Sequence, residues 1–185
     1  MRDHAIVTPH FWTGKTGRYI RSCGGDAQRV ALYLMTCPNS TMIGLYYLPL
    51  PTLCHEIGIP LQGALEALQS LSEGEFSYYD EESETVFVRE MACYQIGRQL
   101  DPKDNRIKGV AKMVGQMIKS PFYKDFLDRY MEVFRLEGLV ENPSSFQAPL
   151  KPLRSQEQEQ EQEQEQEQEY TPPNPPLGGA SEKTP

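Results

Sequence analysis

The stretch Pro51–Ser72, PTLCHEIGIPLQGALEALQSLS, decides the fold. Its first part predicts two turns of helix that end at Gly58. Pro60 is expected at the first position of a second helix, which ends at Glu73-Gly74. The apolar stripe of this second helix is Leu61, Ala64, Leu65, Leu68 and Leu71. Two helices joined by so short a turn are typical of a helix-turn-helix.

The sequence on either side of this pair completes a larger pattern. Two β-rich runs follow it, Phe76–Asp80 and Glu84–Val88, and an acidic tip between them predicts a hairpin. The short aromatic run Gly44–Leu48 precedes the pair and predicts a strand. Before that strand we expect a helix with Asp26 as its N-cap. Its apolar face is Ala27, Val30, Ala31 and Leu34.

Helix, strand, two helices and a hairpin, in this order, indicate a winged helix-turn-helix. The predicted fold class is therefore mostly α with a small β-hairpin (α+β), followed by a disordered tail. We expect a winged-helix DNA-binding domain over residues 1–100 and a helical extension over residues 101–141. Residues 142–185 form the tail, which contains the Gln-Glu alternation Gln156–Glu169 and a proline-rich end. Neither part of the tail can bury enough apolar surface to offset the entropy lost on ordering.

The negative charge of the chain is unevenly distributed. The whole sequence carries a formal charge of −8. Residues 1–150 hold 15 Lys and Arg against 18 Asp and Glu, a net −3, while the last 35 residues hold three against eight, a net −5. The part expected to fold is therefore close to balanced. Its basic residues are grouped, and grouping matters more than net charge for contact with backbone phosphates.

The sequence offers no sign of a membrane span, a metal site or a catalytic site. Its apolar runs are far shorter than the roughly 20 residues that a membrane helix needs. The four cysteines are scattered, with no pair at metal-ligand spacing, which predicts reduced thiols and neither metal nor cofactor. The three histidines have no serine or acidic partner at a known motif spacing. We expect a noncatalytic protein in the cytoplasm.

Several stretches resemble the N-terminal domain of bacteriophage and prophage replication proteins. They include Thr8–Arg18 (TPHFWTGKTGR), Val30–Thr36, Met42–Pro51 (MIGLYYLPLP) and Met91–Gly97, and the likeness covers about residues 1–136. The resemblance implies a winged helix that binds origin DNA during replication initiation. It also implies double-stranded DNA and a replicative helicase or helicase loader as partners, and the cytoplasm of a bacterial host as the location.

Candidate DNA contacts follow from the predicted helices. In a helix-turn-helix the second helix enters the major groove, where Gln pairs with adenine. Its predicted exposed face carries no Lys or Arg, and the hairpin tip is acidic, so phosphate contacts must come from elsewhere. Lys15, Arg18 and Arg21 are spaced along one side of a helix, and residues 103–119 predict an amphipathic helix with a basic face. The candidate residues are Lys15, Arg18, Arg21, Gln62, Gln69, Ser70, Arg89, Lys103, Arg106 and Lys108.

Two other functions stay open. A winged-helix transcriptional regulator predicts a dimer and a palindromic site. A protein-interaction adaptor, which would use the acidic hairpin and the Gln-rich helix to contact another protein, predicts no salt-dependent affinity for DNA.

The aromatic residues Phe11 and Trp12 are expected to anchor the core, because large aromatic side chains dominate core packing.

Overall fold

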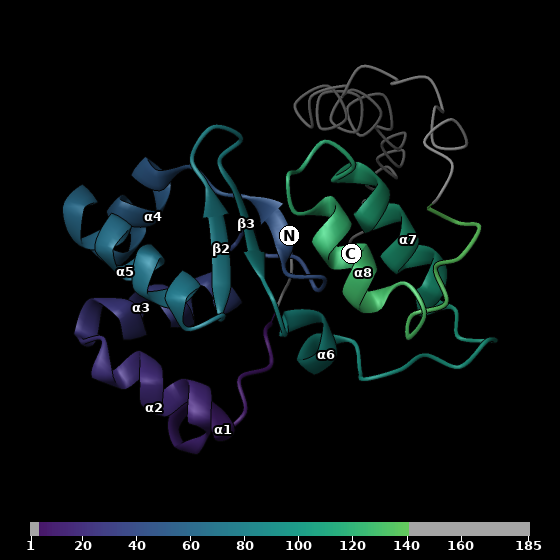
Figure 1. Ribbon diagram of the computed structural model, residues 1–185, viewed down its shortest axis with the longest axis horizontal. Helices are drawn as coiled ribbons and strands as arrows, with labels where there is room; N and C mark the ends of the chain where they lie inside the picture. Colours follow the sequence, from purple (N-terminus) through teal and green to yellow (C-terminus); the bar gives the residue numbers. More distant parts are fainter. Residues whose placement is uncertain (1–3, 141–185) are drawn as a thin grey trace, which may run out of the picture. The chain divides into compact units, whose positions relative to one another are not determined.

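A computed structural model describes residues 4–140 (Figure 1). The predicted tail, residues 142–185, lies outside the described residues. The described chain is about half helical and has one small antiparallel sheet, which confirms the α+β class. The elements are α1 (His10–Thr13), α2 (Lys15–Ser22), α3 (Gly25–Thr36), β1 (Leu45–Tyr47), α4 (Leu50–Ile57), α5 (Leu61–Glu73), β2 (Ser77–Asp80), β3 (Thr85–Val88), α6 (Met91–Gln95), α7 (Arg106–Gln116) and α8 (Tyr123–Tyr130).

The predicted helix pair is present as α4 and α5. Gly58 ends α4 in the left-handed conformation, with φ 66° and ψ 43°, which glycine adopts without steric cost. Its N–H donates to the carbonyl of Cys54 at 3.0 Å and closes the last turn. Pro60 lies one residue earlier than predicted. It is the cap of α5, with an extended ψ of 155°, and the helix begins at Leu61.

The predicted N-cap of α3 is wrong. The helix begins at Gly25, and Gly24 is the cap, with a φ of 104° that suits glycine. Asp26 therefore lies inside the first turn, and its carboxylate pairs with Arg29 one turn later. A carboxylate in the first turn still interacts favourably with the helix dipole, so the sequence signal was real but was assigned to the wrong position.

The three strands form an antiparallel sheet in the order β1-β3-β2. Leu45 on β1 and Tyr78 on β2 both pair with Phe87 on the central strand. All four residues of β3 are buried, because this strand has neighbours on both edges and helices on both faces. The hairpin predicted from the two β-rich runs is confirmed, with the turn between Asp80 and Thr85.

Alternation along β3 divides the buried residues into two clusters, one on each face of the sheet. Val86 and Val88 pack with α3 and α5, whereas Phe87 packs with α7 and α8. The second cluster contains an aromatic series at helical spacing, Phe126, Tyr130 and Phe134, with neighbouring ring centroids 4.9 Å apart. Within residues 4–140 no helix is both long and apolar enough to cross a bilayer.

Candidate nucleic-acid interface

Helix α2 presents three of the predicted cations to solvent. Lys15, Arg18 and Arg21 are all exposed, and none forms an ion pair with any carboxylate of residues 4–140. Residues three apart on a helix are separated by about 60° around its axis, so these three share one side of α2. The opposite side is buried through Gly17 and Ile20. Among the described residues, therefore, no carboxylate pairs with the three positive charges of this helix.

Tyr19 fixes α2 against the far end of α5. Its hydroxyl donates to the carbonyl of Ser70 at 3.2 Å. Its ring lies so close to Gly74 that a side chain at that position would overlap it. Because β2 begins at Ser77, soon after this contact, the α2 cations flank the base of the hairpin and not its acidic tip.

The outward stripe of α5 is formed by Gln62, Glu66, Gln69 and Glu73, all exposed. The amide of Gln62 donates to Glu66 at 2.8 Å, and the amide of Gln69 donates to Glu73 at 3.1 Å. Both candidate base-reading amides therefore already have intrahelical acceptors. Either amide would have to exchange its glutamate for a base edge before it could read DNA.

Ser70 does not belong to this outward stripe. Its side chain is half-buried, and its hydroxyl donates to the carbonyl of Glu66 at 2.9 Å within the same helix. Its own carbonyl accepts the Tyr19 hydrogen bond. The sequence placed Ser70 beside Gln69 on the exposed face, but one residue further along a helix is a turn of about 100°, which brings Ser70 toward the α2–α3 junction.

No lysine or arginine occurs between Arg29 and Arg89, a segment that includes α4, α5 and the hairpin. The same segment carries eight carboxylates, four of them at the hairpin tip. Hydrogen bonds from the side chain and backbone N–H of Ser83 hold the pKa of Asp80 below its usual value, so this tip carboxylate stays charged. This surface repels phosphate.

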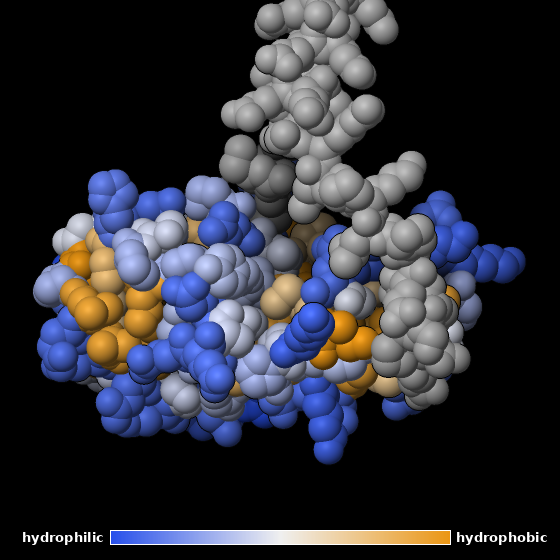
Figure 2. Space-filling view, turned by 90° about the horizontal axis from the view of Figure 1, so that it is seen from above, coloured by the Kyte–Doolittle hydropathy of each residue, from blue (hydrophilic) through white to orange (hydrophobic). Residues whose placement is uncertain are grey.

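The surface of α4 and α5 also has an apolar component. Leu61, at the start of α5, is 54% exposed, and the neighbouring Ile57 and Leu65 are half-buried. Figure 2 shows apolar side chains gathered among hydrophilic ones at the side of the described residues where Figure 1 draws α4 and α5. Together with the absence of cations, this composition is unlike the basic surface that binds a nucleic-acid backbone.

Arg89 and Arg106 are engaged within the protein. Arg89, which follows β3, forms a 2.7 Å ion pair with Glu75. Arg106 pairs with Asp104 at 2.7 Å and also donates to the carbonyl of Ile96 at 2.7 Å. Hydrogen bonds from Arg106 lower the pKa of the Asp104 carboxyl. Each arginine would have to give up an internal partner to bind phosphate.

The predicted basic helix of residues 103–119 is shorter than expected and is present as α7. Lys108, Lys112 and Lys119 are exposed and form no ion pair with the described residues, and the same holds for Lys103 just before the helix. Lys108 and Lys112 lie on α7, and because α7 belongs to the cluster on the other face of the sheet, its lysines are distinct from the cations on α2.

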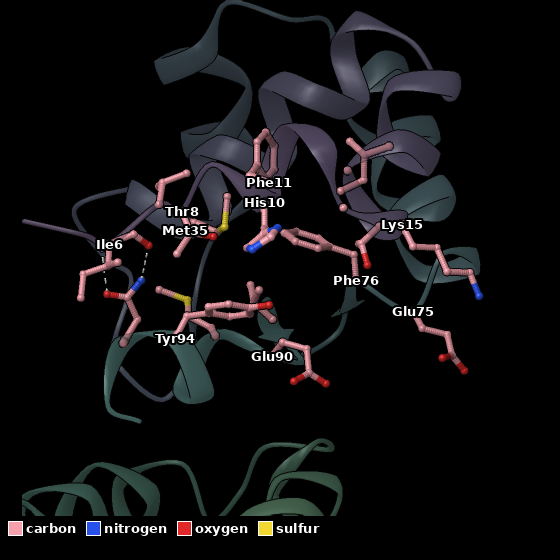
Figure 3. A pocket seen from close by; sticks show the side chains of 18 residues that line it. Ile6, Thr8, His10, Phe11, Lys15, Met35, Glu75, Phe76, Glu90 and Tyr94 are labelled. Carbon is pink, nitrogen blue, oxygen red and sulfur yellow. Dashed lines mark hydrogen bonds between the residues drawn. The ribbon is translucent and has the colours of Figure 1, made fainter. Parts of the chain in front are cut away.

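A hollow of about 320 Å³ lies beside α2 (Figure 3). Phe11 lines it and packs against the core, as expected for this residue. The prediction that Trp12 also anchors the core is wrong, because its side chain is 48% exposed on the short helix α1. This hollow was not predictable from sequence patterns, because its walls come from four separate segments of the chain.

Within the described part of the chain, all four cysteines are free thiols and no group of histidine, cysteine and acidic side chains could hold a metal ion. Comparisons of the chain with protein-family models, with curated proteins and with solved structures found no match.

Proposed function

We propose that residues 4–100 form the winged-helix module, and residues 101–140 its helical extension, of a noncatalytic phage-type replication protein. In this proposal the module binds duplex DNA near an origin and helps to recruit the replicative helicase. Support for the winged helix comes from the order α3-β1-α4-α5-β2-β3 together with the strand order β1-β3-β2. The sequence resemblance to phage replication proteins supports the role in initiation.

The observation that carries the DNA-binding proposal is the set of three exposed cations on α2, none of which pairs with a carboxylate of residues 4–140. Phosphate affinity in water comes chiefly from lysine and arginine, which release condensed counterions when they bind. Since α4, α5 and the hairpin have no such residue, we assign the backbone contacts to Lys15, Arg18 and Arg21. Gln62 and Gln69 are assigned base contacts that form only after their glutamate partners are displaced.

This function is tested by measuring the affinity of the full chain for origin and unrelated duplexes across a salt series. The slope of log K against log salt is about −0.9 per phosphate contact. In the Lys15→Ala, Arg18→Ala, Arg21→Ala triple variant the slope should therefore be less negative than in the wild type by about 2.7. The control is the Lys108→Ala, Lys112→Ala, Lys119→Ala triple variant, which removes the same charge from α7 and the turn that follows it. An equal loss in both variants, or no binding by the wild type at low salt, contradicts the proposal.

The cation-free surface of α4, α5 and the hairpin favours a second candidate function, a protein-interaction adaptor. Exposed Leu61, in a segment that carries carboxylates but no lysine or arginine, suits a partner protein with apolar and basic side chains. An adaptor of this kind should bind purified replicative helicase without DNA. Leu61→Asp should abolish that binding and leave the urea midpoint unchanged. If the helicase binds wild type and variant equally, this surface is not the adaptor site.

A further inference from the structure

The hollow beside α2 is an open apolar groove. Its walls are the extended residues 6–8, helices α1 and α2, and helix α6 (Figure 3). Phe76 and Met91 lie among its apolar lining residues. At about 320 Å³ it is at the lower end of the roughly 300–1,000 Å³ typical of binding sites. It can take a few side chains but not a whole helix.

The groove is already formed in the protein on its own. The side-chain amide of Gln95 accepts from the N–H of Ile6 at 3.1 Å and donates to the carbonyl of Ile6 at 2.8 Å. These two bonds fix the N-terminal wall against α6. Three exposed large apolar side chains, those of Ile6, Val7 and Tyr94, line this same groove. Exposed apolar side chains gathered at one place mark an interaction site.

The charges at the rim select the partner. Glu75 is paired with Arg89, and Glu90 is paired with Arg129, so both carboxylates are already compensated. Lys15 lines the groove and has no ion pair with the described residues. The ionisable side chains that line the groove are those of His10, Lys15, Glu75, Glu90 and Tyr94. The uncompensated lysine therefore attracts an anion at one end of an apolar floor.

We propose that this groove binds a short peptide segment of a partner protein, in which apolar residues adjoin carboxylates. The apolar side chains occupy the floor next to Phe76 and Tyr94, and a carboxylate pairs with Lys15. A sugar–phosphate backbone offers the anion but nothing apolar to cover this floor. The proposal shares Lys15 with the DNA-binding proposal, but its apolar contacts come from α6 and the N-terminal segment, which the DNA-binding proposal does not use. Peptide binding can therefore fail in Tyr94→Ala while DNA binding persists, and the two proposals are tested separately.

The test uses the full chain and two labelled ten-residue peptides with the same Leu and Phe core. One peptide ends in Glu-Glu and the other in Lys-Lys, and binding is followed by fluorescence anisotropy. The acidic peptide should bind on the order of fivefold more tightly, as exposed ion pairs allow. Lys15→Glu should reverse this preference. Tyr94→Ala should weaken both peptides about tenfold, as expected when an aromatic contact residue is removed.

The matched control is Tyr47→Ala, because Tyr47 on β1 is 54% exposed and Tyr94 is 52% exposed. Tyr47→Ala should leave peptide binding unchanged, and all variants should keep the wild-type urea midpoint. The proposal is overturned if neither peptide binds saturably, if Lys15→Glu leaves the preference unchanged, or if Tyr47→Ala and Tyr94→Ala act alike. It is also overturned if Tyr94→Ala removes a dimer or abolishes DNA binding, which would make a second copy or DNA the occupant.

Discussion

Gly17 determines how closely α1 can approach α2. A side-chain carbon at this position would overlap the carbonyl oxygen of Phe11, which is backbone and cannot rotate away. We expect Gly17→Ala to lower the free energy of unfolding by about 1–3 kcal/mol, as overpacked sites do. Gly109 on α7 is the control, since nothing lies within 4 Å of an added carbon there.

Because Gly109 is a helical glycine in open space, Gly109→Ala should stabilise the protein by about 0.5–1 kcal/mol. Urea unfolding measures both changes. If Gly17→Ala is neutral, α1 does not pack on α2 as described. Phe11 would then be free to leave the core, and the groove beside it would lose one wall.

Tyr79 links the stability of the hairpin to alkaline pH. Its hydroxyl donates to the carbonyl of Leu48 at 3.0 Å. Burial and, after it, the nearby charge of Glu84 raise the pKa of Tyr79 from 10.0 to about 12. The folded state therefore keeps a proton that the unfolded state releases at lower pH. The stability from this protonated hydroxyl is complete below about pH 10 and is lost as the pH rises to about 12.

The measurement is the free energy of unfolding from pH 9 to 12 in wild type and Tyr79→Phe. Other buried tyrosines, such as Tyr33, also have raised pKa values, so both proteins should lose stability. The variant should lose less of it, because it has no hydroxyl at this position. If the two plots of unfolding free energy against pH ran parallel, the pKa of Tyr79 would be the same in the folded and unfolded states.

Helices α7 and α8 cover the second face of the sheet, and Phe126 is fully buried there. Its ring lies 6.1 Å from that of Phe87 on the central strand. We expect Phe126→Ala to reduce the free energy of unfolding by about 3–5 kcal/mol. Because β3 contributes to both clusters, the loss should appear equally in Trp12 fluorescence, which reports on α1, and in helical circular dichroism. If Trp12 fluorescence keeps its wild-type midpoint, the two clusters unfold separately.

At the level of elements, the sequence predicted those helices, strands and turns that depend on residues close together in the chain. The apolar stripe from Leu61 to Leu71 and the breaker Gly58 define α5 and its turn, and β-rich runs on either side of an acidic tip define the hairpin. The strand order and the second cluster were not predictable, because they depend on contacts between distant residues such as Phe87 and Phe126. The Asp26 cap failed because the acidic signal of a first turn does not fix its position.

At the candidate interface, too, properties set by neighbouring residues were predicted and contacts between distant residues were not. The spacing of Lys15, Arg18 and Arg21 predicted a shared helix face, which is a local property. Nothing local revealed that Arg89 pairs with Glu75, since these residues belong to different segments. The groove was missed for the same reason, because Ile6 and Tyr94 meet only in three dimensions and neither stands in a recognisable motif.

Across the described part of the chain, charge is sorted by location. Helices α2 and α7, which lie on opposite faces of the sheet, each carry exposed cations, and the segment between Arg29 and Arg89, with α4, α5 and the hairpin, has carboxylates but no lysine or arginine. A phosphate backbone would therefore be attracted to either basic surface and repelled from the surface between them. This is why comparing the α2 and α7 triple variants at equal charge loss is more informative than any single substitution.

The absence of lysine and arginine from residues 30–88 also has a practical consequence. A protease that cuts after basic residues releases Val30–Arg89 as one peptide, even from the unfolded chain, and this peptide contains all three strands of the sheet. Reagents that acylate amines mark α2 and the lysines from Lys103 onward, but leave α4, α5 and the hairpin without a label. Protein immobilised through its lysines therefore keeps the cation-free surface chemically untouched and open to whatever binds it.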